Sequence, residues 1–356
     1  MNTGIVTDYN NSLHRYRGIG TYTNILIASL KKYDTVNSYT EIAQNEKIKS
    51  SIQILHYPFF DFFKRTLKVY KNIKTVVTIH DIIPIKFSEH FPSGMQGTIN
   101  FWLQKKQLRM VDAIITDSQC SKSDIHSILG ISDNIIHVVG IAYGGNDKLV
   151  TRDAAFPLRL NTGLTVSYPF LLYVGDINWN KNIIGLIRAF SKLKSQHRAL
   201  NKLHLLLVGK AFTGPNIPEL VEIQKAVKTS GYAEDIIYAG FVSQDELYSL
   251  YRAASVYVQP SWYEGFGLPV LDALGRGTLV VSSNASSLPE VGGDAVLYFD
   301  PARIEDMVRC LFTALTLPKT KREHLIKAGM KQAGFFTMKR MAQDTIRVYQ
   351  SVLDIP

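Results

Sequence analysis

Residues 260–272 have the sequence Pro-Ser-Trp-Tyr-Glu-Gly-Phe-Gly-Leu-Pro-Val-Leu-Asp, and this stretch decides the expected fold. The apolar run 255–258 before it is typical of a buried strand. Gly265 and Gly267 are turn-forming residues, and Pro269 suits the first position of a helix, where a missing N–H costs nothing. The stretch therefore predicts a strand, a tight loop and then a helix.

The start of that helix is a candidate anion site. The amides of Gly267 and Leu268 point out of the first helical turn, and such an end attracts anions. Glu264 lies in the loop, and Asp272 follows inside the helix. We therefore expect two carboxylates to flank one ligand, whereas as isolated residues they would be only a loop charge and a helix charge.

The same stretch resembles the signature E-G-F-G-L-P-x-x-E-A of the retaining glycosyltransferases of family 4, which have the GT-B fold. Asp272 stands where the family usually has its second Glu, so its side chain is one methylene shorter. The resemblance implies that Glu264 contacts the transferred sugar of a nucleotide-sugar donor and that Asp272 approaches the ribose. It also implies a donor-binding loop that consists of Gly265, Phe266, Gly267 and Leu268.

His80 and Asp81 directly follow another predicted strand, 75–79. Residues just beyond the carboxyl end of a parallel strand face the ligand crevice of an open sheet. The run from Thr78 to Pro84 resembles the family's H-D-x-x-P segment, in which the His reaches the donor sugar or its phosphate. We therefore expect His80 to be catalytic, while Asp81 contacts the acceptor, orients His80 or caps the next turn.

Gly18 and Gly20 stand between a first predicted strand, 3–7, and a helical pattern with Tyr22 on its apolar face. Glycine at such a place lets the backbone approach a ligand closely. The dinucleotide fingerprint fails here, because no third glycine follows at the required spacing. The stretch resembles the family's G-G-I-G-x-Y loop, which implies that it lies against the donor phosphates and the acceptor; the alternative is ordinary turn chemistry.

Ser118 follows a further predicted strand that begins at Val111. Either Ser118 or Ser121 suits the cap of the next helix, and Ser121 with Asp124 has the spacing of a capping-box variant. The run resembles the family's A-D-x-I-x-x-x-S-x-x-S segment, which implies that Ser118 lies near the acceptor. A structural role explains these residues equally well.

Lys181 stands near the start of a helix that follows the predicted strand 170–174. A lysine there makes a point-charge contact with a diphosphate. The family pattern at this place is R-K-N, and here Asn180 replaces the Arg. One of two expected phosphate cations is thus missing, and Arg15 or Arg17 are candidates to compensate.

Another strand, 236–239, ends beside residues that the resemblance assigns to the nucleobase. These residues are Gly240, Phe241 and Val242. Their backbone would bind the base of the donor, and ordinary packing between strand and helix is an equally good explanation. Ser243 and Glu246 then have the spacing of a capping box.

The strand, loop and helix pattern recurs through both halves of the chain, which predicts an α/β protein with mainly parallel sheets. We expect the GT-B architecture, with two Rossmann-like domains facing a central cleft. Residues 150–168 lose periodicity and mark a linker. The expected parts are an acceptor-binding domain at 1–165, a nucleotide-sugar-binding domain at 166–337 and a helix at 338–356 that crosses back to the first domain.

The 356 residues are 46% hydrophobic and 20% charged, a globular composition long enough for two cores. Cys120 and Cys310 lie far apart without metal-ligand spacing, which suggests reduced thiols. No secretory leader and no apolar run of the ~18 residues that a membrane span needs is present. We therefore expect a cytoplasmic protein.

The net charge of +10 fits an anionic partner. No zinc-finger spacing, RNP-like run or dense basic arm points to nucleic acid. A mixture of rings and cations that suits anionic lipid headgroups, and hence a peripheral place on the inner face of the membrane, occurs at Phe59, Phe60, Phe62, Phe63, Lys64 and Arg65. The alternative is that these rings line the core or an acceptor cleft.

Together these features predict a retaining transferase that moves a hexose from a nucleoside diphosphate to a hydroxyl of a glycan or lipid-linked saccharide. Bond breaking leaves charge on the diphosphate and makes the sugar oxocarbenium-like. Lys181 and the glycine-rich helix starts would stabilise the diphosphate, while Glu264 and His80 would act near the sugar. No D-x-D motif and no clustered ligand set occurs, so we expect neither an essential metal ion nor a cofactor.

The segment His80-Asp-Ile-Ile-Pro84 most resembles family members that use GDP-mannose to build surface polysaccharide of the O-antigen or capsule type. GDP-mannose is therefore the first candidate donor, with UDP- and dTDP-sugars as alternatives. Two other functions stay open, a non-catalytic partner subunit of a glycosyltransferase complex and a nucleotide-sugar epimerase of the same fold. A nicotinamide-dependent oxidoreductase is disfavoured by the missing fingerprint.

Overall fold

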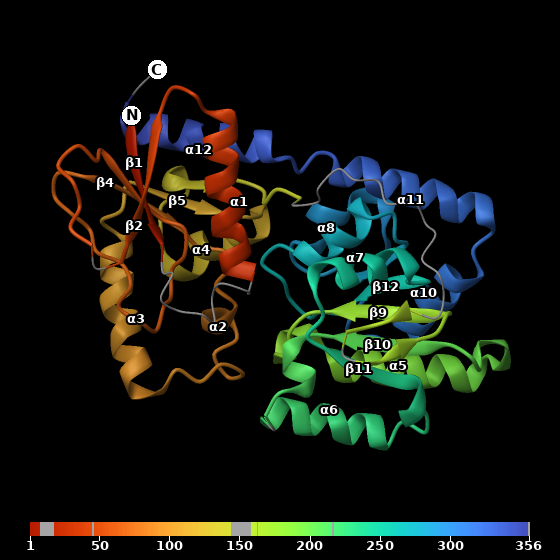
Figure 1. Ribbon diagram of the computed structural model, residues 1–356. Coiled ribbons are helices and arrows are strands. Elements are labelled where there is room, and N and C mark those ends of the chain that lie inside the picture. Colours follow the sequence, from red (N-terminus) through yellow and green to blue (C-terminus); the bar gives the residue numbers. More distant parts are fainter. Residues whose placement is uncertain (8–17, 45, 144–157, 162, 216, 355–356) are drawn as a thin grey trace. The chain divides into compact units, whose positions relative to one another are not determined.

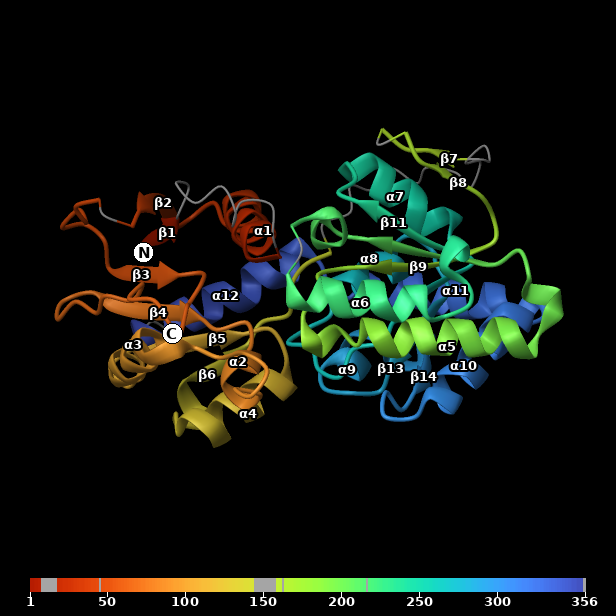
Figure 2. The same cartoon turned by 90° about the horizontal axis from the view of Figure 1, so that it is seen from below.

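The computed structural model describes residues 1–7, 18–44, 46–143, 158–161, 163–215 and 217–354 (Figure 1). The chain divides into two compact units. The first consists of Met1–Gly144 with Phe336–Pro356, and the second of Gly145–Phe335. Helices cover both faces of a central sheet in each unit (Figures 1 and 2).

The first unit contains a six-stranded parallel sheet with the order β2-β1-β3-β4-β5-β6. Its strands are β1 (Asn2–Thr7), β2 (Ser38–Ala43), β3 (Ile54–Tyr57), β4 (Lys74–Thr78), β5 (Ala113–Thr116) and β6 (Ile136–Val138). Its helices are α1 (Gly18–Tyr33), α2 (Ile83–Lys86), α3 (Gly94–Leu108), α4 (Gln119–Leu129) and α12 (Met338–Val352). Every residue of β3 and β5 is buried, as expected for parallel strands that helices cover on both faces.

The second unit contains a parallel sheet with the order β11-β10-β9-β12-β13-β14 and a small antiparallel pair, β7-β8. The strands are β7 (Leu158–Arg159), β8 (Thr165–Val166), β9 (Phe170–Val174), β10 (His204–Val208), β11 (Ile236–Gly240), β12 (Val256–Gln259), β13 (Val280–Ser283) and β14 (Leu297–Phe299). The helices are α5 (Ile183–Gln196), α6 (Pro218–Lys228), α7 (Gln244–Ala253), α8 (Leu268–Gly275), α9 (Leu288–Gly292), α10 (Ile304–Thr316) and α11 (Lys319–Ala333). This is the strand order of a Rossmann fold. Successive strands are added on one side of β9 up to β11, and from β12 onward they are added on its other side.

The predicted pair of α/β units with parallel sheets is confirmed. Strands β9 and β13 begin and end where the sequence pattern places them. The pattern predicts neither β2 nor α3, and the pair β7-β8 lies within the stretch 150–168 expected to be a linker without strands. The assignment of acceptor and donor binding to 1–165 and 166–337 stays a prediction, as does the crossing-back role of 338–356.

The aromatic segment expected to meet lipid is instead part of the core. Phe60 and Phe62 are each 6% exposed and belong to the main apolar cluster of the first unit, with Phe63 packed against it. Phe59 is half-buried as well. Insertion into a membrane is therefore wrong for Phe60 and Phe62, and the core alternative is confirmed for these two rings. Nothing supports membrane insertion of Phe59 or Phe63. Lys64 and Arg65 remain exposed.

Gly18 and Gly20 are not in a loop before a helix, because α1 already begins at Gly18. Both therefore belong to the first helical turn, where backbone N–H groups have no partner within the helix. Arg15 and Arg17 lie outside the described residues. Contact of the two glycines with donor phosphates stays a prediction.

Candidate functional site

The loop after β12 is held rigidly by serines of the β13–α9 segment. Ser283 donates through Oγ to the carbonyl of Ser261 at 2.7 Å, and Ser286 Oγ accepts from the amide of Glu264 at 2.8 Å. Ser287 donates to the carbonyls of Glu264 and Phe266, each at 2.9 Å. The backbone on both sides of Glu264 is thus fixed before any ligand binds.

Two asparagines of the β9–α5 loop join the same segment from the other side. The Asn180 side chain donates to the carbonyl of Tyr263 at 2.9 Å, and the backbone carbonyl of Asn180 accepts from the amide of Trp262 at 2.8 Å. Asn182 donates to the carbonyl of Pro260 at 3.0 Å. Asn180 is 4% exposed, so the residue that replaces the expected Arg has a structural role that links two loops.

The Glu264 carboxylate is the centre of a buried polar cluster. Lys181 Nζ lies 2.8 Å from Oε1 and 2.7 Å from Oε2, and Gln259 and Ser261 donate to Oε1 at 2.8 and 2.7 Å. Glu264 is 6% exposed, and the Lys181 side chain is 20% exposed. A buried charge needs such a partner and saturated hydrogen bonds, so the pair holds both side chains in one geometry.

This ion pair lies at the topological switch point of the second sheet. Lys181 follows β9 and Glu264 follows β12, the two neighbouring strands from which the chain leaves in opposite directions. Ligands of open α/β sheets bind outside the carboxyl ends of the strands at such a point. The sequence predicts each residue separately, and the strand order brings them together.

Helix α8 begins in this cluster, as the sequence predicts. Gly267 is its N-cap with φ +108°, proline occupies the first turn, and no described side chain caps the start. A Cβ at Gly267 would lie 2.8 Å from Cδ2 of Leu288, so glycine is required by both its φ angle and the space. The amide end of α8 is therefore available to an anion.

Asp272 does not stand alone in the helix. Its Oδ1 lies 2.7 Å from Nη1 of Arg276, one turn later, and the Arg276 guanidinium stacks 3.6 Å above the ring centre of Tyr248. The Asp272 side chain is 31% exposed. Its contact with a ribose stays a prediction, and its observed partner is Arg276.

The three candidates for the nucleobase lie at the end of β11, where Gly240 is the last residue of the strand and Phe241 and Val242 follow it. Gly240 has φ +65°, and a Cβ there would lie 2.6 Å from Oγ1 of Thr213. Phe241 is 62% exposed, while Val242 is buried. Ser243 and Glu246 then form both hydrogen bonds of the predicted capping box, which fixes the direction in which α7 leaves the strand.

His80 is paired with an acid that the sequence motifs do not single out. Its Nδ1 lies 2.6 Å from Oδ2 of Asp117, which is 3% exposed. His80 follows β4 and Asp117 follows β5, and these strands are paired with Thr78 opposite Ile115. That equivalent position just beyond a neighbouring strand is the signal that would have identified Asp117.

The surroundings of His80 favour its charged form. Burial lowers the pKa of the imidazole. The adjacent Asp117 carboxylate and its hydrogen bond raise the pKa by more than burial lowers it, so the pKa lies above its ordinary value. Burial raises the pKa of Asp117, against the effect of His80. A hydrogen bond with the backbone of Pro58 also raises the pKa of His80, and the other ring nitrogen, Nε2, is buried.

A second, fully buried histidine lies close by. His56 Nδ1 lies 2.6 Å from the Tyr349 hydroxyl and Nε2 lies 2.8 Å from Oγ1 of Thr78, which also contacts the Tyr22 hydroxyl at 3.1 Å. Burial, with the nearby His80, lowers the pKa of His56 to about 3. His56 is thus neutral and joins α12 to the sheet of the first unit.

Asp81 and Ser118 both form helix-start hydrogen bonds. Asp81 Oδ1 accepts from the amide of Ile83 at 2.9 Å. Ser118 is the N-cap of α4 and accepts from the amide of Ser121 at 3.0 Å, which decides between the two predicted caps. The Ser121 hydroxyl instead donates to the carbonyl of His80 at 3.0 Å. Acceptor contacts of Asp81 and Ser118 stay predictions.

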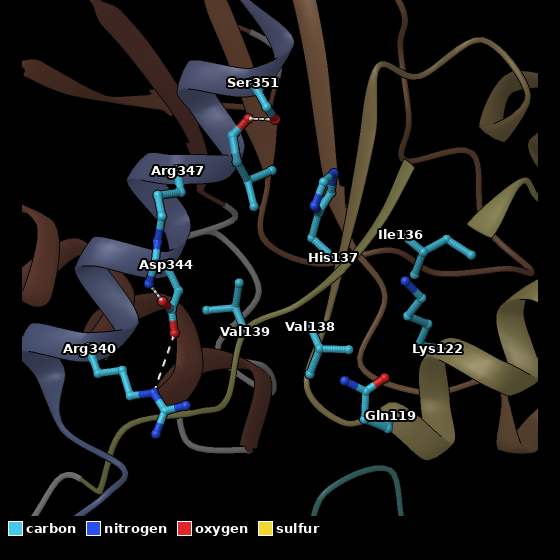
Figure 3. A pocket seen from close by; sticks show the side chains of 11 residues that line it. Gln119, Lys122, Ile136, His137, Val138, Val139, Arg340, Asp344, Arg347 and Ser351 are labelled. Atoms are coloured by element: carbon cyan, nitrogen blue, oxygen red, sulfur yellow. Dashed lines mark hydrogen bonds and ion pairs between the residues drawn. The ribbon is translucent and has the colours of Figure 1, made fainter. Parts of the chain in front are cut away.

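A pocket of about 530 Å³ in the first unit lies apart from these residues (Figure 3). Its walls come from α4, β6 and α12, and no predicted site residue lines it. Figure 3 shows Asp344 between Arg340 and Arg347, and Lys122 pairs with Asp133 at 3.1 Å. The cations of this pocket are therefore already paired with carboxylates.

In the part of the chain that the structure describes, no group of three or more His, Cys, Asp or Glu side chains is arranged to hold a metal ion. Metal independence stays a prediction. No helix within the described ranges has both the length and the apolar character required to cross a bilayer.

Comparison with known proteins identifies the family. The model described as Glycosyltransferase Family 4 matches residues 17–140, and that described as Glycosyl transferases group 1 matches residues 159–332. The O-antigen chain mannosyltransferase B of Escherichia coli is 30% identical over 282 residues, which cover 78% of this chain and 70% of that protein. The chain belongs to glycosyltransferase family 4.

Other relatives support this assignment. The serotype-specific mannosyltransferase WbdA of Escherichia coli is 28% identical over 74% of this chain, but the match spans only 32% of that longer protein. Sucrose-phosphate synthase from Thermosynechococcus elongatus has a TM-score of 0.73 at 16% identity, with 99% of each chain covered. Anabaena HepE, solved with UDP and glucose, has a TM-score of 0.69 at 14% identity, covering 99% of this chain and 100% of that one. The fold of this family 4 member is GT-B.

Proposed function

We propose that this glycosyltransferase moves a hexose, with retention of anomeric configuration, from a nucleoside-diphosphate sugar to a hydroxyl of a glycan or lipid-linked saccharide. The observation that carries the proposal is the Lys181–Glu264 pair at the switch point of the second sheet. The names of the relatives favour mannose from GDP-mannose and the synthesis of a surface polysaccharide. The complex of HepE with UDP and glucose supports a nucleotide-sugar donor as a class.

Lys181 and Glu264 have complementary roles in this proposal. Lys181 supplies the positive charge for the diphosphate, and the uncapped start of α8 adds backbone amides. Within the described part of the chain, Glu264 Oε1 accepts from three side chains and Oε2 from Lys181 alone. Since a carboxylate oxygen has two lone pairs, Oε2 can accept a further hydrogen bond, and we assign this to a hydroxyl of the transferred sugar.

His80 has the features of a group that recognises the donor sugar or its phosphate. The hydrogen bond to Asp117 orients the ring through Nδ1, and we assign the other, buried nitrogen, Nε2, to the ligand. In its charged form Nε2 donates a hydrogen bond, which suits an oxygen that becomes negative as the leaving group departs. As in the family, the leaving diphosphate would take the proton of the attacking acceptor hydroxyl.

The departure at Asn180 does not by itself indicate an inactive partner subunit. The buried Asn180 side chain donates one hydrogen bond to the donor-loop backbone, and its backbone carbonyl accepts another, so Asn180 supports the structure of the site. Lys181 alone then provides the side-chain charge at this loop. A non-catalytic subunit and an epimerase remain the outcomes against which the proposal is tested.

The direct test measures product formation with GDP-mannose, UDP-glucose and a dTDP-hexose, after thermal-shift screening with GDP, UDP, dTDP and ADP. A nucleotide at a hundred times its Kd stabilises the folded protein by about 2.7 kcal/mol, which is a readily measured shift. The expected result is one strongly stabilising nucleotide and an α-linked product from the α-linked sugar of that donor. Epimerised sugar without transfer, or no shift with any nucleotide, would overturn the proposal.

A further inference from the structure

Helix α3 exposes an unusual set of large apolar side chains. Met95 is 86% exposed, Trp102 69%, Met110 61% and Ile99 53%. Met110 stands just beyond the last turn of the helix. The helix runs along the outside of the first unit in both views (Figures 1 and 2). Such a group costs hydration free energy unless a partner covers it.

These side chains share one face of the helix. Residues 95, 99, 102 and 106 are spaced by three or four positions, so they form one stripe at 3.6 residues per turn. The opposite face is buried and contains Gly97, Gln104 and Leu108. We name the exposed stripe of Met95, Ile99, Trp102, Leu103 and Met110 the α3 face.

The buried face of α3 includes a polar residue, Gln104, beside the apolar Leu108. Its buried Gln104 donates to the carbonyls of Asp61 and Lys64, at 3.2 and 2.7 Å, and to Oγ1 of Thr66 at 3.2 Å. An internal polar residue thus holds the helix on the unit while the tryptophan points outward. The segment with the four phenylalanines is the support beneath α3, because Asn100 donates to the carbonyl of Phe63 at 2.8 Å.

Cations lie beside the second half of the α3 face. Lys105, Lys106 and Arg109 lie on or just after the last turns of the helix, and no acidic residue occurs between Ser93 and Val111. Arg65 joins them from the neighbouring segment, where its Nε donates to Oδ1 of Asn100 at 3.3 Å. The apolar stripe is therefore bordered by positive charge.

We propose that the α3 face binds the surface of an anionic lipid bilayer. Met95 and Ile99 would enter the acyl boundary, Trp102 would lie at the headgroup level, and the cations would contact lipid phosphates. A protein partner is disfavoured because lysine is depleted from the centres of protein interfaces, whereas Lys106 lies within this stripe. A lysine at a bilayer extends its charge to the headgroups while its methylenes stay apolar.

The inference does not depend on the donor or acceptor proposed above, because lipid binding is measured without turnover. It predicts that the full-length protein floats with vesicles of phosphatidylcholine that contain phosphatidylglycerol, and far less with phosphatidylcholine alone. Raising the salt concentration should weaken binding, since screening reduces the attraction of exposed charges.

Two variants test the two components separately. Met95→Ser/Ile99→Ser/Trp102→Ser should lower the partition coefficient at least about tenfold, because it removes the apolar contribution. The charge variant carries Lys105→Gln, Lys106→Gln and Arg109→Gln. Because it lacks these cations, it should bind anionic vesicles as weakly as neutral ones. The matched control is Ile217→Ser/Val221→Ser, which removes exposed apolar side chains at α6 and should bind like the wild type.

Circular dichroism and the Tm establish that each variant is folded. Wild-type binding by the folded triple serine variant would overturn the proposal, as would failure of the wild type to bind anionic vesicles. A wild type that is dimeric and a triple serine variant that is monomeric would assign the α3 face to a protein interface instead.

Discussion

Replacing Lys181 by Ala should separate the structural from the catalytic role of the Lys181–Glu264 pair. The change leaves the carboxylate of Glu264, which is 6% exposed, without its cation. Removing one partner of a fully buried pair costs roughly 3–5 kcal/mol. Here Gln259 and Ser261 still donate to Oε1, and the Lys181 side chain is 20% exposed, so we expect a loss of about 2 kcal/mol.

For a unit of this size, 1 kcal/mol changes the Tm by about 2–4 °C, so Lys181→Ala should lower the Tm by about 4–8 °C. The double variant Lys181→Ala/Glu264→Gln removes the uncompensated charge as well and should recover most of that loss. Lys192→Ala is the matched control, because it breaks the Lys192–Glu305 pair whose side chains are 39% and 70% exposed. An exposed pair contributes about 0–1 kcal/mol, so this Tm should change little.

Turnover should follow a different pattern from stability. We expect Lys181→Ala and Glu264→Gln each to lower turnover at least about tenfold, which is about 1.4 kcal/mol of barrier. The double variant should stay slow although it is stable again. Recovery of turnover together with the Tm would mean that the pair only holds the loop and that Lys181 does not stabilise the diphosphate. A Lys181→Ala variant as stable as Lys192→Ala would refute the argument from burial.

Three further predictions rest on other contacts of the two units. His80 has a raised pKa, so its pairing with Asp117 stabilises the fold fully below the unfolded pKa of about 6.5 and is lost as pH rises through the native pKa. Asp117→Asn should flatten this dependence of Tm on pH and lower turnover, and an unchanged pH profile would contradict the pairing. Asn180→Ala should cost about 1–2 kcal/mol, read from the Tm, because the carbonyl of Tyr263 loses its donor. Asn180→Arg should not raise turnover, because the side chain it replaces is buried between two loops; a gain would contradict this. Gly267→Ala should destabilise the protein by about 1–3 kcal/mol through its φ angle and the clash with Leu288, and an unchanged Tm would refute the strain.

Much of the site could be predicted from local sequence. A strand followed by glycines, a proline and a helix pattern is specified within a dozen residues, so the loop at Glu264 and the start of α8 follow from it. The capping box of Ser243 and Glu246 is equally local. No local pattern identifies Asp117, because its contact with His80 depends on the pairing of β4 with β5.

The amino-acid sequence by itself determined the parallel α/β architecture of both halves and the separate identities of Glu264, Lys181 and His80, because hydrophobic periodicity and turn chemistry act over short distances. Only the tertiary structure decided that Lys181 meets Glu264, since the two are 83 positions apart and the order of β9 and β12 brings their loops together. It also decided which aromatic residues are exposed. Rings beside lysines have the same composition at the edge of a core and at a membrane. Burial of Phe60 and exposure of Trp102 are therefore decided only when α3 packs on the segment 59–66.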